Sequence, residues 1–249
     1  MLKDITLGQY FPGNTPIHRM DPRTKLLLTM VYIVALFLCK GFFSYAVALV
    51  FLVTAVAVSR IRLKALFKGL KPLLILIAFT ALLNLFYTDG TVLVRFWIFK
   101  ITREGVRNAC FLVLRIVMLV AGTFLLTYTT SPISLTDGLE SLLSPLKKIK
   151  FPVHELSMMM SIALRFIPTL IEETDKIISA QKARGADFET GGLIRRADEL
   201  AVAMECRCYH GGEGRTKLRQ LRFGARDAAA FAAGLLLLGG IITLRIFGL

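Results

Sequence analysis

The chain has 249 residues, of which 55% are apolar and 19% are charged, and its mean hydropathy is +0.64. This composition excludes an intrinsically disordered chain, and four cysteines in a chain of this length exclude a small disulfide-stapled secreted module. The net charge of +14 does not form one basic segment, because residues 131–227 are nearly balanced and the remaining excess flanks apolar runs. We therefore expect an integral membrane protein that does not bind nucleic acid.

Residues 1–25 form a polar segment that is broken by Pro12, Gly13 and Pro16. The segment has no apolar core ahead of a cleavage site, so we expect no secretory signal peptide. Two of the four cysteines lie in or beside apolar runs and two lie in a charged region, a distribution that suggests no disulfide framework. Reduced thiols are the expectation, as in other cytosol-facing proteins.

Five apolar runs follow this segment and predict transmembrane helices. They cover about residues 24–39, 42–59, 72–87, 109–130 and 228–247. Because a span needs ~20 mostly apolar residues, the first and third runs reach that length only by including flanking residues. The predicted fold is an all-α membrane protein with about five transmembrane helices and long amphipathic cytoplasmic helices.

The loops between the runs predict the orientation, because Lys and Arg are retained on the cytoplasmic side. Residues 60–71 carry five basic and no acidic side chains, which places this loop and the amino terminus in the cytoplasm. The loop at 88–108 carries four basic residues and is then outside, against the rule. The predicted organisation in the cell membrane is an amino-terminal segment with four spans (1–130), a cytoplasmic region (131–227) and a carboxyl-terminal span (228–249).

Arg115 lies within the fourth apolar run, where a charge at the bilayer centre would cost several kcal/mol. Since it lies near the start of the run, the first interpretation is that its side chain extends to the outer interface. The alternative is a contact with a partner membrane subunit. In a self-contained secondary transporter, Arg115 would be the candidate for an ion or proton path.

The cytoplasmic region begins with an amphipathic helix. Apolar residues recur at helical spacing over residues 154–185, and charged residues interrupt them, so this segment does not span a bilayer. At ~1.5 Å per residue these 32 residues reach roughly 48 Å, with a kink expected near Pro168. Three consecutive methionines at 158–160 resemble soft-metal ligands, but they point in three directions around a helix, which favours packing.

Two patterns nearer the carboxyl end resemble ligand-binding sites. Cys206, Cys208 and His210 form a C-x-C-x-H pattern, yet positions two apart diverge by ~200° on a helix and no further group completes a tetrahedral zinc site. The sequence GGEGRT at 211–216 resembles a phosphate-binding loop but has Arg215 in place of the lysine and lacks the upstream glycine. We therefore predict no metal site, no cofactor and no catalytic residues.

Three separated segments carry a resemblance to a known family. They are GQYFPGNTPIHRMDPRTKLL at 8–27, QKARGADF at 181–188 and RRADELAVAMECRCYHGGEGRTKL at 195–218. In this order they resemble EcfT, the transmembrane T component of energy-coupling factor transporters for vitamins and metal ions. The resemblance implies a scaffold without catalytic chemistry, which joins two ABC ATPases to a membrane-embedded, substrate-binding S component.

The resemblance also implies which residues contact the partners. In the family, two long coupling helices each end in an Ala-Arg-Gly motif that docks on one ATPase. The corresponding residues here are Ala183, Arg184 and Gly185 in the first helix and Cys206, Arg207 and Cys208 in the second. An arginine suits this role because its guanidinium stays charged and pairs bidentately with acidic groups. The expected S-component interface on the first helix comprises Met158, Met159, Ile162, Ala163, Phe166, Ile167 and Leu170.

One feature departs from the family. Only 21 residues separate Gly185 from Arg207, where the family has a longer, mostly apolar stretch that forms much of the second coupling helix. The junction LIRRADELA at 193–201 indicates an internal deletion. The alternatives from other classes are a self-contained secondary transporter and a membrane enzyme, although the sequence has no visible triad or paired intramembrane carboxylates. The transported substrate is not specified by these residues.

Overall fold

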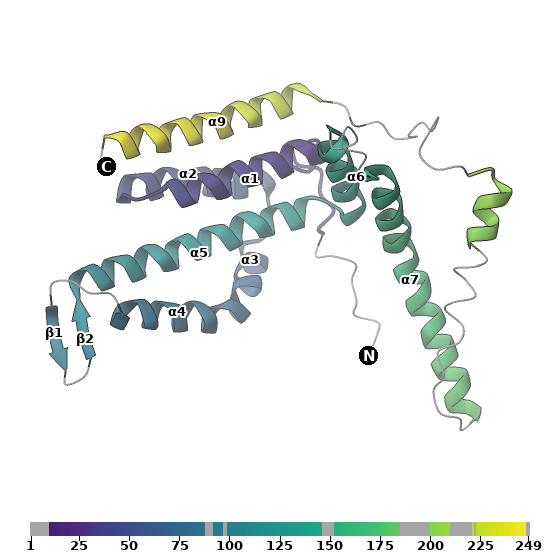
Figure 1. Cartoon of the computed structure of the whole chain (residues 1–249), viewed down its shortest axis with the longest axis horizontal. Coiled ribbons are helices and arrows are strands. Elements are labelled where there is room, and N and C mark those ends of the chain that lie inside the picture. Colours follow the sequence, from purple (N-terminus) through teal and green to yellow (C-terminus); the bar gives the residue numbers. More distant parts are fainter. Residues whose placement is uncertain are drawn as a thin grey trace. The chain divides into compact units, whose positions relative to one another are not determined.

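The computed structural model describes residues 10–87, 92–96, 99–145, 152–184, 200–209, 221 and 223–247. The described residues are predominantly helical (Figure 1). The contacts between residues divide the chain into two compact units. We call Phe11–Thr130 with Phe223–Leu249 the bundle, and Met1–Tyr10 with Ser131–Arg222 the arm unit.

The bundle combines helices from both ends of the chain. Its elements are α1 (Pro22–Leu38), α2 (Phe42–Ser59), α3 (Leu63–Leu70), the 3₁₀ helix η1 (Lys71–Leu73), α4 (Leu74–Tyr87), β1 (Val92–Phe96), β2 (Phe99–Thr102), α5 (Arg103–Thr129) and α9 (Ala225–Ile246). α1 packs mainly against α9 and α5, α2 packs against the same two helices, and α4 packs along α5. Figure 1 shows α1, α2, α5 and α9 running side by side.

Four helical stretches among the described residues are long and apolar enough to cross a membrane. They are Phe42–Ser59, Lys64–Leu85, Arg103–Thr129 and Ala225–Ile246. The predicted first span corresponds to α1, whose 17 residues give a helix of ~26 Å, slightly shorter than an apolar layer of ~30 Å. α1 nevertheless packs between helices of the bundle. The predicted all-α membrane fold is confirmed, with four of the five predicted spans found among the described residues, and the span at α1 stays a prediction.

Capping side chains decide where two of these helices begin. Asp21 precedes α1, and its carboxylate accepts a hydrogen bond from the Arg23 backbone N–H at 3.0 Å. Thr102 precedes α5, and its hydroxyl accepts from the Gly105 N–H at 3.1 Å. α5 therefore begins at Arg103 rather than at the predicted residue 109, because the cap stabilises a polar first turn that hydropathy alone does not detect.

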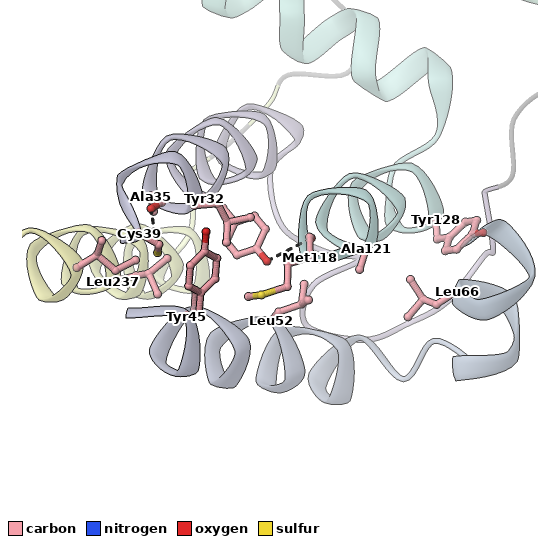
Figure 2. Close-up of a cluster of buried hydrophobic side chains, with 13 residues drawn as sticks. Tyr32, Ala35, Cys39, Tyr45, Leu52, Leu66, Met118, Ala121, Tyr128 and Leu237 are labelled. Atoms are coloured by element: carbon pink, nitrogen blue, oxygen red, sulfur yellow. Dashed lines mark hydrogen bonds between the residues drawn. The ribbon is translucent and has the colours of Figure 1, made fainter. Parts of the chain in front are cut away.

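The core of the bundle is a cluster of buried side chains from α1, α2, α3, α5 and α9 (Figure 2). Tyr32 on α1 is 4% exposed, and its hydroxyl donates to the Met118 carbonyl of α5 at 3.3 Å. The Tyr32 ring lies so close to Gly122 of α5 that a Cβ at this position would meet it at 2.6 Å. Glycine therefore allows α1 and α5 to approach each other closely.

The connection between α4 and α5 contains a short hairpin that was not predicted. β1 and β2 pair antiparallel, with Phe96 opposite Phe99 and Arg95 opposite Lys100. An isolated two-stranded hairpin is marginally stable in water, so it needs support from neighbouring elements. β2 has such support, because it contacts both α4 and α5.

The arm unit contains α6 (Pro132–Leu143) and α7 (Val153–Arg184), which pack against each other. Residues 200–206 form a further helix. α7 has 32 residues and continues as one helix through Pro168. The long amphipathic helix predicted at 154–185 is therefore confirmed to within one residue at each end. α6 was not predicted as a separate element, because its sequence PISLTDGLESLL is half polar and lacks a clear apolar stripe.

Candidate functional site

The first arginine motif lies at the end of α7. Ala183 is exposed, and Arg184 is the last residue of the helix. Gly185 lies outside the described residues. A glycine directly after a helix is a common arrangement, because glycine adopts the left-handed backbone conformation of this position at low cost. The described part of α7 therefore ends at the arginine of the Ala-Arg-Gly motif.

The second motif also forms a helix end, with well-defined hydrogen bonds. The helix at 200–206 closes with the Tyr209 N–H donating to the Met204 carbonyl at 3.1 Å and the Cys208 N–H donating to the Glu205 carbonyl at 2.8 Å. Cys208 has φ = 53°, in the left-handed region. These two bonds and this φ define a Schellman motif, in which Cys208 takes the position that glycine usually occupies.

Both motifs therefore place an arginine next to a helix carboxyl end. Cys206, Arg207 and Cys208 are all exposed, so the Arg207 guanidinium is accessible to a partner. The carbonyl groups at a helix carboxyl end carry partial negative charge and favour a cation there. The five N–H donors of each guanidinium can pair bidentately with carboxylates. The chemistry of the two ends fits recognition of acidic groups rather than catalysis.

The predicted S-component residues share one side of α7. Their sequence spacing of three to four residues places them along a continuous stripe of the helix. Met159 is 61% exposed and Ala163 is also exposed, while Met158, Ile162, Phe166, Ile167 and Leu170 are half-buried. The stripe thus keeps apolar surface accessible, and Arg165 and Glu172 are exposed on the same helix. This arrangement gives α7 an amphipathic surface over most of its length.

A polar contact that sequence reasoning missed joins the start of α7 to α6. Glu140 of α6 pairs with His154 of α7 through its Oε1, at 3.1 Å from Nδ1, and its Oε2 accepts from the Ser157 hydroxyl at 2.7 Å. Val153 beside them is 2% exposed. The contact fixes the first turn of α7 on α6. Nothing in the local sequence pairs residues 14 and 17 positions apart, so this contact had no signal of its own.

Arg115 makes its contacts inside the bundle. Its Nε donates to the Tyr45 hydroxyl at 2.8 Å, and an Nη donates to the Cys39 carbonyl at 3.2 Å, just beyond the end of α1. The guanidinium carbon also lies 5.9 Å and 5.8 Å from the ring centroids of Phe37 and Tyr45. Arg115 lies near the middle of α5 and connects this helix to the junction of α1 and α2.

The amino-terminal motif connects the ends of three helices. Asp227 of α9 accepts from the Asp21 N–H at 2.8 Å and from the Gly224 N–H at 2.9 Å. Lys25 of α1 donates from Nζ to the His18 carbonyl at 3.2 Å and to the Thr129 carbonyl of α5 at 2.9 Å. Asp21, Lys25 and Asp227 are each at most 6% exposed. These residues join the amino ends of α1 and α9 to the carboxyl end of α5.

His18 belongs to the same segment and precedes α1. Its Nε2 donates to the Phe11 carbonyl at 3.1 Å, and its Nδ1 accepts from the Thr15 hydroxyl at 2.6 Å. Burial lowers the pKa of His18 from its ordinary value of 6.5, and the positive charge of Lys25 lowers it further, while the Phe11 carbonyl raises it. His18 is therefore a neutral structural link at neutral pH.

The ligand-like patterns gain no support as metal sites. Within the part of the chain that the structure describes, no three His, Cys, Asp or Glu side chains gather as metal ligands. Cys206 and Cys208 are exposed free thiols. His210 and the GGEGRT sequence at 211–216 lie outside the described residues.

Comparison with known proteins identifies similar chains. The sequence model of the family described as cobalt transport protein (CbiQ) matches residues 13–218. Proteins named energy-coupling factor transporter transmembrane protein EcfT are similar over nearly the full length. The one from Thermosediminibacter oceani is 51% identical over 97% of this chain and 98% of its own. Those from Clostridium kluyveri (50%, 99% of each chain) and Bacillus subtilis (43%, 98% of this chain and 100% of its own) are also similar.

The alignments also show that this chain is shorter than these relatives within the aligned region. The match to the Thermosediminibacter oceani protein extends over 261 residues but covers 97% of this chain, which is about 242 residues. The match to the Clostridium kluyveri protein extends over 267 residues and covers 99% of this chain, about 247 residues. These relatives therefore carry about 20 residues inside the aligned region that this chain lacks.

Proposed function

The chain belongs to the EcfT family, the transmembrane components of energy-coupling factor transporters, and we propose that it joins two cytoplasmic ABC ATPases to a substrate-binding membrane subunit. It is a transport component and not a catalytic subunit, and ATP hydrolysis belongs to the partner ATPases. The observation that carries the proposal is the pair of arginine-bearing helix ends at 183–185 and 206–208.

Each arginine docks one ATPase. A guanidinium at a helix tip is held away from the helix surface and retains its charge, so it can enter an acidic groove on a partner. The exposure of Arg207 and its neighbours and the Schellman end that presents them support this role. At the first site, Ala183 and Gly185 are small enough to let the partner backbone approach closely.

The apolar stripe of α7 contacts the S component. We call α7 the first arm and the segment from Gly185 to Arg207 the second arm, and each arm ends in one of the arginine motifs. Movement of the ATPases displaces these ends, and a continuous helix of ~48 Å transmits the displacement along the first arm. Exposed Met159 and half-buried Phe166 and Leu170 give the stripe an apolar contact surface, and flexible methionines suit an interface that slides. The Glu140 contact keeps the base of α7 on α6 while the tip moves.

The protein lies in the cell membrane with its amino terminus and the arm unit in the cytoplasm. The basic residues at 60–71 support this orientation, because short loops rich in Lys and Arg remain on the cytoplasmic side. The arm unit must share that side for its arginines to meet ATPases. The transported substrate is a vitamin or a metal ion that the S component selects.

Co-purification tests the docking role. The chain is expressed with the two ATPases of its own genome, purified in detergent, and compared with Arg184→Glu and Arg207→Glu. Reversing a charge at a partner contact costs ~2–5 kcal/mol, so we expect each variant to lower ATPase capture more than roughly tenfold. Arg165→Glu is the matched control, since Arg165 is an exposed arginine in the middle of α7. Full ATPase capture by both tip variants would refute the docking role.

The secondary-transporter alternative rested on Arg115. The Arg115 guanidinium is occupied by Tyr45 and the Cys39 carbonyl, an arrangement that suits a structural role more than an ion path. Vesicles that contain the chain and an S component, but no ATPase, separate the two functions. We expect no ATP-independent accumulation of the S-component ligand in such vesicles, and accumulation there would favour the alternative.

A further inference from the structure

An apolar groove opens at one end of the bundle. It has a volume of about 380 Å³ and lies between the amino ends of α1 and α9 and the carboxyl ends of α2 and α5. Small residues on α9 leave it open, because Ala229, Ala230 and Ala233 all line it. From Arg226 to Ala233 the groove follows α9 for ~10 Å. All of its lining residues belong to the bundle.

The walls of the groove offer few polar partners. Aliphatic and aromatic side chains such as Leu28, Phe51 and Leu126 supply most of the surface. Three threonines also line it, but their hydroxyls donate to carbonyls of their own helices. The bonds run from Thr29 to Lys25 at 2.8 Å, from Thr54 to Phe51 at 2.8 Å and from Thr129 to Leu125 at 2.7 Å. The interior is therefore suited to a hydrocarbon chain and not to a polar solute.

Two cations line the groove, one exposed and one buried. Arg226 is exposed and has no ion-pair partner among the described residues. Lys25 also lines the groove, is 6% exposed, and uses two of its three N–H groups on the His18 and Thr129 carbonyls. None of the described lining residues is acidic. The neighbouring Asp227 is 4% exposed, and its oxygens accept backbone N–H groups.

We propose that this groove binds an anionic phospholipid, with an acyl chain along α9 and the headgroup phosphate at Arg226 and the free N–H of Lys25. The combination of a dry apolar wall and an unpaired guanidinium at its mouth matches an amphiphile with a negative headgroup. The groove opens at the same end of the bundle as the basic α2–α3 connection. In the orientation proposed above, this end meets the cytoplasmic leaflet, where anionic lipids concentrate.

Lipid binding in this groove does not require the proposed coupling role. It can therefore be tested with the full chain purified without its partners. The detergent-purified chain is titrated with palmitoyl-oleoyl phosphatidylglycerol or with the matching phosphatidylcholine, and retained lipid is counted by native mass spectrometry. We expect one tightly retained phosphatidylglycerol, with at least a fivefold preference over phosphatidylcholine. Arg226→Gln should reduce the preference at least threefold, and Ala230→Trp should abolish retention by filling the groove.

Arg245→Gln is the matched control, because Arg245 is an exposed arginine at the opposite end of α9. It should leave the lipid preference unchanged. Circular dichroism establishes that Ala230→Trp retains its helices, and Arg226→Gln tests the headgroup contact without altering the groove. Equal retention of the two lipids by the unmodified chain would overturn the proposal. So would an Ala230→Trp variant that keeps phosphatidylglycerol but fails to assemble with its partner subunits, since the groove would then be a protein-docking surface.

Discussion

Cys208 holds a backbone conformation that usually belongs to glycine. Its φ of 53° lies in the left-handed region, where a Cβ crowds the following carbonyl. The Tyr209 and Cys208 N–H groups nevertheless complete the helix end that presents Arg207. By the family resemblance, Cys208 corresponds to the glycine of the Ala-Arg-Gly motif. In the structure, Cys208 also adopts the left-handed backbone conformation that glycine usually adopts at a helix end.

Glycine at position 208 should stabilise this helix end. Cys208→Gly removes the unfavourable Cβ contact of the left-handed conformation, and we expect a gain of about 1 kcal/mol in local stability. Amide hydrogen exchange at residues 200–207 measures it, and the amides should exchange roughly fivefold more slowly. Cys206→Gly is the matched control, because a glycine within the last helical turn costs about 1 kcal/mol and should speed the exchange. Faster exchange in Cys208→Gly would contradict this account of the helix end.

At the scale of the helices, one buried carboxylate connects the amino ends of α1 and α9. The bond from the Asp21 N–H to Asp227 joins residues 206 positions apart, and both are buried. The second carboxylate oxygen accepts from Gly224 at the start of α9. Asp227 therefore caps its own helix and at the same time holds the amino end of α1.

Asp227→Asn tests this connection. An amide keeps the size of the side chain but offers only one acceptor oxygen, so either the buried Asp21 N–H or the part-buried Gly224 N–H loses its partner, and the loss of the buried one costs about 1–3 kcal/mol. We expect a lower midpoint in thermal unfolding, followed by far-UV circular dichroism in detergent. Glu172→Gln is the control, since it makes the same acid-to-amide change at an exposed position of α7 and should leave the midpoint unchanged. Equal midpoints for the two variants would show that Asp227 is not a structural link.

The sequence predicts elements better than it predicts contacts between them. The apolar runs and the helical spacing at 154–185 identified every long helix among the described residues, because hydropathy and periodicity are local properties. α5 began earlier than expected since a threonine cap extends it into polar residues. The hairpin and α6 were missed because each is short and carries a weak pattern. The contacts of Glu140 with α7 and of Asp227 with Asp21 had no local signal, since each joins residues distant in the chain.

At the scale of the whole molecule, the two arginine-tipped arms differ in length. α7 extends over 32 residues, ~48 Å, whereas only 21 residues separate Gly185 from Arg207. The relatives carry about 20 residues that this chain lacks, a length that adds ~30 Å to a helix. We predict from the junction LIRRADELA at 193–201 that the missing stretch belongs to the second arm. Two ATPases that move together should then displace the two arms unequally.

Restoring the stretch should therefore increase coupling. The corresponding segment of the Thermosediminibacter oceani protein is inserted between the two motifs, and the complex is reconstituted with its ATPases and S component in vesicles. We expect accumulation of the labelled S-component ligand per ATP hydrolysed to rise at least threefold, because a second long helix transmits the movement that the short one does not. A flexible Gly/Ser insertion of equal length is the control and should give no increase, since a random coil supplies reach without stiffness. If the unmodified chain couples as well as the extended one, the length of the second arm does not limit transport, and the docking of Arg207 alone is sufficient on that side.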